Sequence, residues 1–485
     1  MKILLVSPEV APYAKTGGLA DVAGSLPRAL RQLGHDVRII MPCYKTAREK
    51  GFTLRKGRKS VEVAIGGTPR KGMLRQTTLD GVPVYLIENR DYFERDELYG
   101  TGAEDYPDNA ERFGFFCRAV LEFLRRLDFR PDILHLNDWQ ASLIPVLLRT
   151  ELRDDPFFAA MRTVLTIHNL GYQGLFPASV LTTLGLDADE LMTIDRLEYY
   201  GQASLLKGGI LFADRLNTVS ETYCREIQTP EMGLGFDGIL RQRQKQLSGI
   251  INGIDPRQWD PAFDAMIANP YQIEDLRGKT ANKKGLQREL GLSSPVSTPI
   301  VAMVTRLDVQ KGLDLVEEAW SELMKRDLQL VLLGSGEQGL TERFARLGEA
   351  HPGQVSIHLG FDDALARRIY AGSDMFLMPS RYEPCGLGQL IALRYGTVPV
   401  VRRTGGLADT IVDPLENQRR ANGFSFEESS AAALLATVDR ALAVYRDRRS
   451  WLKLVKFGMK QDFSWTNSAH RYVELYQQAL EESNA

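Results

Sequence analysis

Short apolar runs alternate with longer segments of helical periodicity along most of this chain. Parallel strands joined by crossover helices give such a pattern, because strands buried on both faces are apolar throughout. The candidate strands are KILLVS, VRIIMP, VPVYLIEN, DILHLND, TVLTIHN and RLNTVS in the first half, and PIVAMVTR, LQLVLLG, VSIHLG, MFLMPS and TVPVVRR in the second. The clearest helix lies between residues 110 and 127, where apolar side chains, Cys117 among them, recur at three- and four-residue spacing. The pattern predicts an α/β fold with one doubly wound sheet in each half.

The change between the two halves falls near residues 245–256, where the polar run RQRQKQ is followed by SGIINGIDP. Glycine and proline in this stretch suit a hinge better than the interior of an element. A chain of 485 residues also exceeds what one ordinary core holds. We therefore expect an N-terminal domain over 1–248 and a second domain over 249–460. A C-terminal helix over 461–485 has an amphipathic stripe that would pack back on the N-terminal domain.

Charge, cysteine content and hydropathy argue against several kinds of partner and site. Sixty Lys and Arg residues against 62 Asp and Glu leave a formal net charge of −2, which gives no electrostatic reason to expect nucleic acid or an anionic membrane. The four cysteines form no CxxC pair, so neither a zinc site nor a disulfide framework is indicated. No apolar run approaches the ~18 residues of a membrane span, and the opening MKILLVSPEV is typical of a buried strand. We expect a cytoplasmic protein without nucleic-acid or membrane partners.

Two nearly identical octets stand near opposite ends of the chain: KTGGLADV from Lys15 to Val22, and RTGGLADT from Arg403 to Thr410. A basic residue beside two glycines allows backbone N–H groups to approach a bound anion, because no Cβ blocks the approach. A single copy is equally typical of a glycine-rich turn that opens a helix. The presence of both copies favours a functional role for these loops over a simple turn.

Polar residues follow several of the predicted strands, at the edge where open α/β sheets bind ligands. These clusters are Asn137, Asp138 and Trp139; His168, Asn169 and Gly171; Arg306 and Lys311; and Arg381, Glu383 and the run PCGLGQL. Arg306 and Lys311 could neutralise a diphosphate without a metal, although a solvated loop has the same composition. Glu383 stands just ahead of a glycine-bearing helix start, where free N–H groups favour an anion. A carboxylate beside an anion site fits the departure of a phosphate from a carbon that becomes cationic, as in glycosyl transfer.

These motifs together resemble those of a known family. KTGGLADV, LNDWQ, IHNLGYQG, NGID, TRLDVQKG, SRYEPCGLGQL and RYGTVPVVRRTGGLADT are similar, in order and spacing, to motifs of the bacterial glycogen synthases and plant starch synthases, which are retaining glucosyltransferases. The resemblance implies the GT-B fold, with two Rossmann-like domains facing a central cleft. It implies an ADP-glucose donor, an α-1,4-glucan acceptor such as glycogen, and neither cofactor nor metal. A UDP-glucose donor is the alternative, followed by a non-catalytic glucan-binding protein.

The resemblance also implies roles for individual residues. Glu383 would lie beside the glucose ring, His168 would contact the glucose 6-hydroxyl, and Arg306 and Lys311 would hold the diphosphate, with Asp138 nearby. The residues implied to bind substrate are Lys15, Gly17, Gly18, Tyr106, Asn169, Asn252, Phe361, Cys385, Gly386, Leu387, Thr404, Gly405 and Gly406. Phe361 stands where many family members have a tyrosine that stacks on adenine.

The chemistry implied for the family differs from that of ordinary glycosidases, which use a pair of carboxyl groups. Related retaining transferases carry a second Glu eight positions after the first, but Ile391 stands there in this chain. We therefore adopt same-face attack through a short-lived ion pair as the hypothesis. Cys385 has no assignable general base and is more typical of a packed thiol.

Several other motifs are better explained without a ligand. Gly334 to Gly339, GSGEQG, matches a dinucleotide motif, but no acidic residue ends a strand about 20 residues later, so a tight turn is favoured. Asp187 to Asp189 matches a metal-binding DxD, but an Asp at a helix start is typical of a cap. The histidines have no metal-binding spacing, and His135 and His358 fall inside strand patterns. A glycogen phosphorylase would need a pyridoxal phosphate lysine and a much longer chain, and a dehydrogenase would need a nicotinamide site.

Overall fold

The computed structural model describes residues 1–101, 104–293 and 295–481, and the chain divides into two compact units. The first unit comprises Met1–Ile250 together with helix α19 (Trp465–Glu481), and the second comprises Ile251–Ser464. The chain passes from the first unit to the second just beyond β14 (Leu247–Gly249), the last strand of the first unit. The chain returns to the first unit after Ser464. Near the two ends of the second unit, the N–H of Ile254 donates to the carbonyl of Phe463 at 2.8 Å, so the two connecting segments are paired within that unit.

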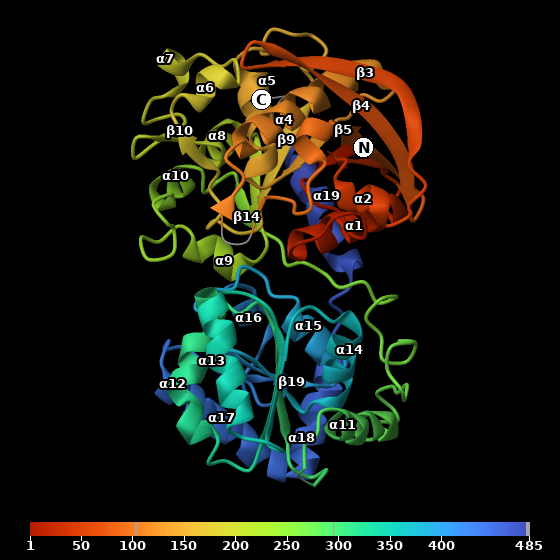
Figure 1. Cartoon of the computed structure of the whole chain (residues 1–485), viewed down its shortest axis with the longest axis vertical. Coiled ribbons are helices and arrows are strands. Elements are labelled where there is room, and N and C mark those ends of the chain that lie inside the picture. The colour runs from red at the N-terminus through yellow and green to blue at the C-terminus, as the bar shows by residue number, and fades with distance from the viewer. Residues whose placement is uncertain (102–103, 294, 482–485) are drawn as a thin grey trace. The chain divides into compact units, whose positions relative to one another are not determined.

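A nine-stranded sheet forms the centre of the first unit, in the order β14-β13-β9-β8-β1-β2-β5-β4-β3 (Figure 1). The strands besides β14 are β1 (Lys2–Val6), β2 (Asp36–Pro42), β3 (Arg55–Ile65), β4 (Thr68–Leu79), β5 (Val82–Glu88), β8 (Ile133–Asn137), β9 (Arg162–Ile167) and β13 (Arg215–Thr218). The strands from β14 to β5 are parallel, whereas β5, β4 and β3 are antiparallel. Short strands outside this sheet are β6 (Gly100–Thr101), β7 (Glu104–Asp105), β10 (Leu175–Pro177), β11 (Glu198–Tyr199) and β12 (Gln202–Ser204).

Helices cover both faces of this sheet, and the buried strands and helices share one apolar core. They are α1 (Gly18–Gln32), α2 (Lys45–Glu49), α3 (Arg90–Phe93), α4 (Asn109–Arg126), α5 (Leu143–Arg149), α6 (Val180–Thr183), α7 (Ala188–Leu191), α8 (Leu205–Phe212), α9 (Glu221–Glu226), α10 (Asp237–Gln242) and the 3-10 turn η1 (Trp139–Ala141). Helix α1 packs against α19, and α4 and α5 pack together with α8 beside α5. The apolar face predicted for residues 110–127 is that of α4, where Cys117 is buried in the core.

Helix α19 is held on the first unit by buried polar contacts as well as by its apolar stripe. His135 Nδ1 lies 2.8 Å from the Tyr476 hydroxyl, and Asn217 Nδ2 donates to the Tyr472 hydroxyl at 3.1 Å. Both tyrosines are fully buried. The last helix thus completes the core of a domain whose other residues, Met1–Ile250, precede it by the whole length of the second unit.

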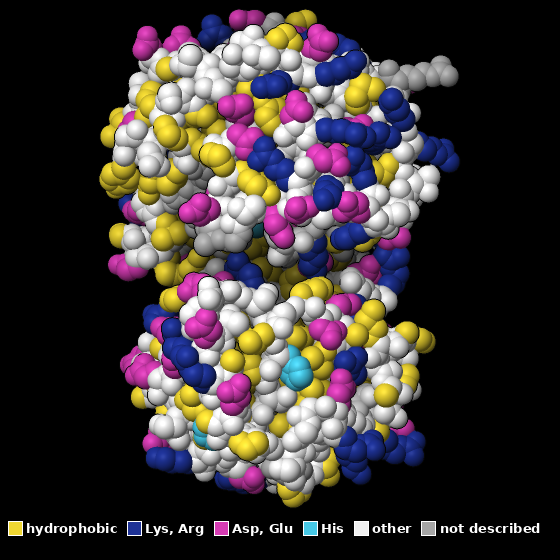
Figure 2. Space-filling model, viewed as in Figure 1, with side chains coloured by type: hydrophobic (Ala, Val, Ile, Leu, Met, Phe, Trp, Pro, Cys, Tyr) yellow, Lys and Arg dark blue, Asp and Glu magenta, His cyan; other side chains and the backbone are white. Residues whose placement is uncertain are grey.

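The hairpin of β3 and β4 was missed by sequence reasoning, although its signal is present. Val61, Val63 and Ile65 are buried while the residues between them are exposed, and the two strands are joined by Gly66 and Gly67, both with positive φ. Basic side chains on β3 obscured this alternation. Figure 2 shows Lys and Arg side chains over this part of the unit; Arg55, Lys56 and Lys59 of β3 are among the exposed residues. Charge on an edge strand opposes pairing with other chains.

The second unit contains a six-stranded, fully parallel sheet in the order β17-β16-β15-β18-β19-β20. Its strands are β15 (Ile300–Val304), β16 (Gln329–Gly334), β17 (Val355–Leu359), β18 (Met375–Met378), β19 (Val398–Arg402) and β20 (Phe424–Phe426). Its helices are α11 (Arg277–Glu289), α12 (Leu313–Leu323), α13 (Gln338–Glu349), α14 (Asp363–Gly372), α15 (Gly388–Arg394), α16 (Gly405–Thr410), α17 (Ala431–Arg446), α18 (Arg448–Lys460) and the turn η2 (Val309–Lys311). Figure 1 shows α12 and α13 on one side of this sheet and α14 and α15 on the other.

Each sheet has one topological switch point, where successive crossovers leave in opposite directions. In the first unit it lies between β1 and β8, and in the second between β15 and β18. Open α/β sheets bind ligands in the crevice at the carboxyl ends of such strands. These two places are therefore where functional side chains are to be sought.

Candidate active site

Both switch points carry residues that the sequence indicated. In the first unit, the loop with Lys15 follows β1, and Asp138 follows β8. In the second unit, Arg306 and Lys311 follow β15, and Glu383 follows β18. The sheet order thus brings together, within each unit, groups that are far apart in the sequence.

A buried carboxylate holds the loop of the first octet. Glu9 is 4% exposed, and its Oε2 accepts the backbone N–H groups of Thr16 at 2.5 Å and Gly17 at 3.4 Å. Its Oε1 accepts the hydroxyls of Thr16 at 2.6 Å and Tyr99 at 2.7 Å. Glu9 therefore positions the loop that carries Lys15. Sequence reasoning missed Glu9, although a carboxylate in the apolar stretch just after the first strand was a usable signal.

The first octet also contains an ion pair of its own. Lys15 Nζ lies 2.8 Å from Oδ1 of Asp21, and the lysine side chain is 41% exposed. Gly17 is the N-cap of α1 and Gly18 its first residue. A Cβ on Gly17 would meet no atom within 4 Å, so packing does not require glycine there. The space beside this glycine is free, while its N–H is already engaged by Glu9.

Asp138 has a strained backbone, with φ 56° and ψ −173°. Such a conformation costs a non-glycine residue about 1–3 kcal/mol and is found mainly at functional sites. Asp138 N–H donates to the carbonyl of Thr166 at 3.0 Å, and Oδ1 accepts the backbone N–H of His168 at 2.7 Å. Burial raises the pKa of Asp138 to about 7, an effect that the nearby Glu9 charge reinforces and the N–H groups of His168 and Asn169 oppose. Strain and a perturbed pKa together mark a candidate functional residue.

The hydrogen-bond network defines the tautomer of His168. Its Nε2 lies 2.9 Å from Oδ1 of Asn137, whose amide nitrogen donates to the carbonyl of Val6 at 3.0 Å. Asn137 Oδ1 is therefore the acceptor, so Nε2 of His168 carries the proton and Nδ1 is an acceptor. Burial lowers the pKa of His168 to about 3, which keeps the ring neutral. The neighbouring Asn169 closes its own turn, because its Oδ1 accepts the N–H of Gly171 at 2.9 Å.

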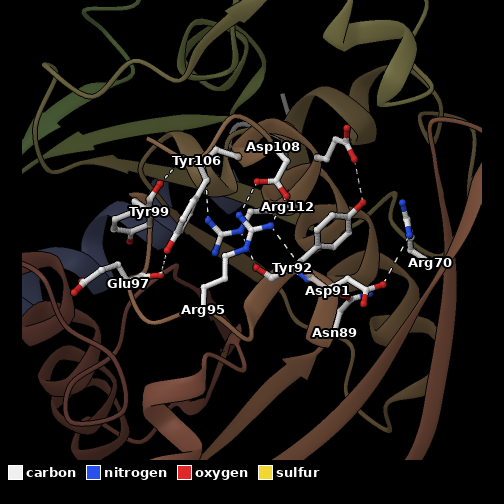
Figure 3. A network of polar contacts seen from close by, with 12 residues as sticks. Arg70, Asn89, Asp91, Tyr92, Arg95, Glu97, Tyr99, Tyr106, Asp108 and Arg112 are labelled. Atoms are coloured by element: carbon white, nitrogen blue, oxygen red, sulfur yellow. Dashed lines mark hydrogen bonds and ion pairs between the residues drawn. The ribbon is translucent and has the colours of Figure 1, made fainter. Parts of the chain in front are cut away.

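Tyr106 lies against two guanidinium groups (Figure 3). The Cζ atoms of Arg95 and Arg112 lie 4.5 Å and 5.0 Å from the centroid of its ring. Arg95 forms a bidentate ion pair with Asp108 at 2.8 and 2.5 Å, and the buried Arg112 donates to the carbonyl of Tyr92 at 2.8 Å. Cation–π contacts of this kind orient an aromatic ring. Tyr106 is thus held in a defined position, although its loop contains little regular structure.

A buried ion pair occupies the switch point of the second unit. Lys311 Nζ lies 2.7 Å from Oε2 of Glu383, and the two side chains are 16% and 7% exposed. The same oxygen accepts the hydroxyl of Ser380 at 3.1 Å. Asp308 accepts the backbone N–H of Lys311 at 3.0 Å and thereby caps the turn that presents the lysine. Arg306, which is about half exposed, lies 3.5 Å from Asp308 and points less deeply into the unit.

The second octet packs on the backbone that carries Glu383. Thr404 is the N-cap of α16, and the N–H of Gly406 donates to the carbonyl of Glu383 at 3.1 Å. A Cβ on Gly405 would lie 1.9 Å from the carbonyl oxygen of Glu383, and one on Gly406 would lie 2.0 Å from that of Cys385. These glycines are therefore required for close approach. The two octets both open helices, but packing requires glycine at Gly405 and Gly406 of the second octet and not at Gly17 of the first.

The other candidate residues near Glu383 are Cys385, Gly386, Leu387 and Asn252. Burial raises the pKa of the Cys385 thiol to about 12, so the group is un-ionised and is no nucleophile at neutral pH. Asn252 hydrogen-bonds to Cys385, and its own buried Oδ1 has no partner among the described residues. Gly386 has a φ of 73°, and Leu387 is the N-cap of α15.

Phe361 is placed apart from this cluster. It follows β17, which is two strands away from β15 in the sheet, and its side chain is 86% exposed. Such exposure is unusual for a phenylalanine unless another group covers it. The preceding Gly360 has a φ of 130°, which only glycine adopts readily.

The alternative motifs have structural explanations. Asp187 caps α7 by accepting the N–H of Glu190 at 3.0 Å, as predicted. The GSGEQG segment is a tight turn between β16 and α13, where a Cβ on Gly336 would lie 2.1 Å from the carbonyl oxygen of Leu307. In the described residues, no group of three or more His, Cys, Asp and Glu side chains could hold a metal ion. None of the described helices has the length and apolar character needed to cross a membrane.

Comparison with known proteins identifies the class to which this fold and site belong. The family of starch synthase catalytic domains matches residues 2–242, and that of group 1 glycosyl transferases matches residues 291–454. The catalytic domain of starch synthase IV from Arabidopsis thaliana, solved with bound ADP and acarbose, is similar with a TM-score of 0.92 and 36% identity over 99% of both chains. The chain is therefore a glycosyltransferase of the GT-B type, built from two Rossmann-like domains.

Full-length relatives define the family more narrowly. The glycogen synthase of Syntrophotalea carbinolica is 60% identical over 99% of both chains, and glycogen synthase 2 of Geobacter sulfurreducens is 55% identical over the same shares. The glycogen synthase of Moorella thermoacetica is 50% identical over 100% of this chain and 98% of its own. This chain belongs to the glycogen synthase and starch synthase family. A sucrose-phosphate synthase from Thermosynechococcus elongatus, at 18% identity and a TM-score of 0.59, shares the fold alone.

Proposed function

We propose that this chain transfers glucose from ADP-glucose to the non-reducing end of an α-1,4-glucan such as glycogen, with retention of the anomeric configuration. The buried pair of Lys311 and Glu383 at the switch point of the second unit carries the proposal. Glucosyl transfer from a nucleotide sugar places negative charge on the leaving phosphate and positive charge on the sugar ring. A lysine and a carboxylate already held side by side can stabilise the two charges as they form.

Each candidate residue has a task in this reaction. Lys311 and Arg306 neutralise the diphosphate, and Lys15 adds a further cation. Glu383 and the carbonyl of His168 stabilise the positive sugar. Because Nδ1 of His168 is an acceptor, it accepts a hydrogen bond from the glucose 6-hydroxyl. The loss of a single such stabilising group lowers an enzymatic rate by about 10²–10³-fold.

Other residues support these groups or complete the substrate site. Asp138 fixes the His168 backbone through its 2.7 Å hydrogen bond. Asn252 offers its unpartnered Oδ1 to a donor hydroxyl, and the exposed ring of Phe361 stacks on adenine. The assigned substrate-binding residues are Lys15, Gly17, Gly18, Tyr106, Asn169, Asn252, Phe361, Cys385, Gly386, Leu387, Thr404, Gly405 and Gly406. Of these, Gly405 and Gly406 act by supporting the backbone of Glu383.

The choice of ADP-glucose is supported by a relative. The starch synthase IV structure, similar over nearly its whole length, was solved with ADP. The acceptor is supported by the names of the bacterial relatives, which are glycogen synthases. We place the reaction in the cytoplasm, where both substrates would be available.

The test is release of nucleoside diphosphate from ADP-glucose or UDP-glucose in the presence of glycogen and a chelator. We expect release with ADP-glucose, and an elongated product that an α-1,4-specific glucanase cuts. Glu383→Ala and Lys311→Ala should be nearly inactive, whereas Lys325→Ala, which removes a lysine from an exposed pair with Glu322, should behave as the wild type. Release from UDP-glucose alone would contradict the donor, and release from neither would contradict the activity.

A further inference from the structure

A cavity lies in the Ile251–Ser464 unit, and none of the candidate residues of that unit lines it. It has a volume of about 450 Å³ and is bounded by α11, the end of α17 and the start of α18. Leu276, Leu442, Trp451 and Val455 supply apolar parts of its wall. Its size falls within the range of small-molecule sites, which are mostly apolar with a few convergent polar groups.

The polar part of the wall is built around two lysines. Lys283 Nζ lies 2.7 Å from Oδ2 of Asp374 and 3.0 Å from the Tyr445 hydroxyl, and the Lys283 and Asp374 side chains are only 6% and 10% exposed. Lys279 Nζ donates to the carbonyl of Tyr395 at 2.9 Å and also contacts the hydroxyl of Thr397. Burial lowers the pKa of Lys279 to about 7. An anion entering the cavity would hold this amine in its charged form.

The rim of the cavity carries further positive charge. Arg446 is the last residue of α17 and Arg448 the first of α18, and both side chains are exposed. Within the described part of the chain, neither arginine forms an ion pair. The acidic residues of the lining are Asp374, which is neutralised by Lys283, and Asp327. Apart from Lys279, the lining holds three cations, Lys283, Arg446 and Arg448, against two carboxylates, so it carries an excess of positive charge that a protonated Lys279 increases.

We propose that this cavity binds a small phosphorylated metabolite. Arg446 and Arg448 hold the phosphate, because guanidinium groups bind phosphate oxygens with directed, charge-assisted hydrogen bonds. The organic part packs on the apolar wall beside Trp451. The ring of Trp451 is kept in place by a T-shaped contact with Tyr445, with centroids 5.1 Å apart.

The cavity and the donor residues lie at opposite edges of one sheet. Asp374 precedes β18, and its Oδ2 accepts the N–H of Ile300, the first residue of β15, at 2.9 Å. Arg306 and Glu383 follow the other ends of these same strands. A ligand in the cavity therefore does not compete with a nucleotide, and both can be bound at once.

Binding is measured by calorimetry on the full chain saturated with ADP, which occupies the donor site. The probes are glucose 1-phosphate, AMP and inorganic phosphate. We expect glucose 1-phosphate or AMP to bind with a Kd of ~1 mM or below, and more tightly than inorganic phosphate. Replacing both rim arginines, Arg446→Gln with Arg448→Gln, should weaken binding by about tenfold or more, since each removes a charge-assisted contact.

Arg449→Gln is the matched control, because Arg449 is exposed on the same helix but does not line the cavity. This variant should bind as the wild type does, and unchanged melting temperatures would show that all variants are folded. Equal binding by the wild type and the double variant would overturn the proposal. So would the absence of binding at ~10 mM of every probe, or binding of inorganic phosphate as tight as that of both organic phosphates.

Discussion

Lys311 and Glu383 are joined in a nearly buried ion pair, with Nζ and Oε2 2.7 Å apart, although 72 residues separate them in the chain. From the sequence, Lys311 was expected to bind the diphosphate of the donor, and Glu383 was expected to lie beside the glucose ring. Their contact shows that both groups belong to one place at the carboxyl ends of β15 and β18. Each group satisfies the other, which avoids the cost of an isolated buried charge.

The pair gives a prediction that separates stability from catalysis. Lys311→Met alone should lower the free energy of unfolding by ~3–5 kcal/mol, because it leaves a buried carboxylate without its partner. Adding Glu383→Gln should restore much of that stability, since no unpaired charge is left. Activity should stay about 10²-fold or more below the wild type in both variants. Denaturant unfolding and rates of ADP release test this; recovery of activity in the double variant would refute the catalytic roles.

Glu9 gives a prediction about loop positioning. Glu9→Gln places an amide among the N–H and hydroxyl donors of Thr16, Gly17 and Tyr99, so at least one buried donor loses its acceptor. We expect a cost of ~1–3 kcal/mol at the loop and a rise in the KM for the nucleotide sugar. Steady-state kinetics should show that Lys15→Ala has little further effect in the Glu9→Gln background. Full additivity of the two changes would show that Glu9 does not act through this loop.

The two octets should respond differently to the same substitution. Gly406→Ala brings a Cβ to within 2.0 Å of the carbonyl oxygen of Cys385, so the backbone that carries Glu383 has to shift. A displacement of this kind can cost ~10²-fold in rate. Gly17→Ala meets no atom within 4 Å and should leave the melting temperature nearly unchanged. Thermal unfolding and activity assays compare them; a well-folded, fully active Gly406→Ala would contradict the packing argument.

Asp138 should make stability fall as the pH rises. Its pKa in the folded chain is raised to about 7, so the folded state binds this proton more tightly than the unfolded state does. The stabilisation is fully present below the unfolded pKa near 4 and is lost as the pH rises through 7. Asp138→Asn should therefore be more stable than the wild type by roughly 1–3 kcal/mol at pH 8, with a smaller difference at pH 5. Urea unfolding at the two pH values tests this, and a difference independent of pH would contradict it.

His135 should produce the opposite dependence on pH. Burial lowers its pKa to about 3, so the folded chain holds the neutral ring between Tyr476 and Thr166. This stabilisation is present above the unfolded pKa near 6.5 and is lost as the pH falls toward 3. His135→Gln should reduce the loss of stability between pH 7 and pH 5 by about 2 kcal/mol.

Tyr476→Phe is the companion variant for this site. It removes the hydroxyl that His135 contacts but keeps the apolar body of the ring in the core. We expect a loss of ~1–2 kcal/mol, seen as earlier release of α19 in hydrogen exchange. Unchanged protection of α19 would show that the apolar stripe alone holds the helix.

Much of the fold could be predicted because it depends on local pattern. The apolar runs that end at Val6, Val304 and Met378 became buried parallel strands, since a strand covered on both faces needs no polar alternation. The capping role of Asp187 was also readable, because a cap is made with residues three positions away. The hairpin of β3 and β4 was missed because its short alternation is flanked by basic residues and glycine.

The site was only partly predictable for a different reason. The sequence showed which polar residues follow strands, but the partner of each depends on the order of strands in the sheet. Glu9 meets Tyr99 across 90 residues, and Lys311 meets Glu383 across 72. No local spacing encodes such contacts, because they arise only when crossovers place loops that are far apart in the sequence at the same edge of a sheet.

By itself, then, the sequence determined two sets of parallel strands and helices and the residue types at the carboxyl ends of those strands. Hydrophobic periodicity is a local property and can be read along the chain. Only the tertiary structure decided that Gly405 and Gly406 of the second octet support Glu383, while Gly17 of the first stands beside open space. It also decided that Lys311 pairs with the carboxylate of Glu383. Those outcomes depend on which backbone segment faces each glycine and which charged group faces Lys311. Both are set by packing between residues that are far apart in the sequence.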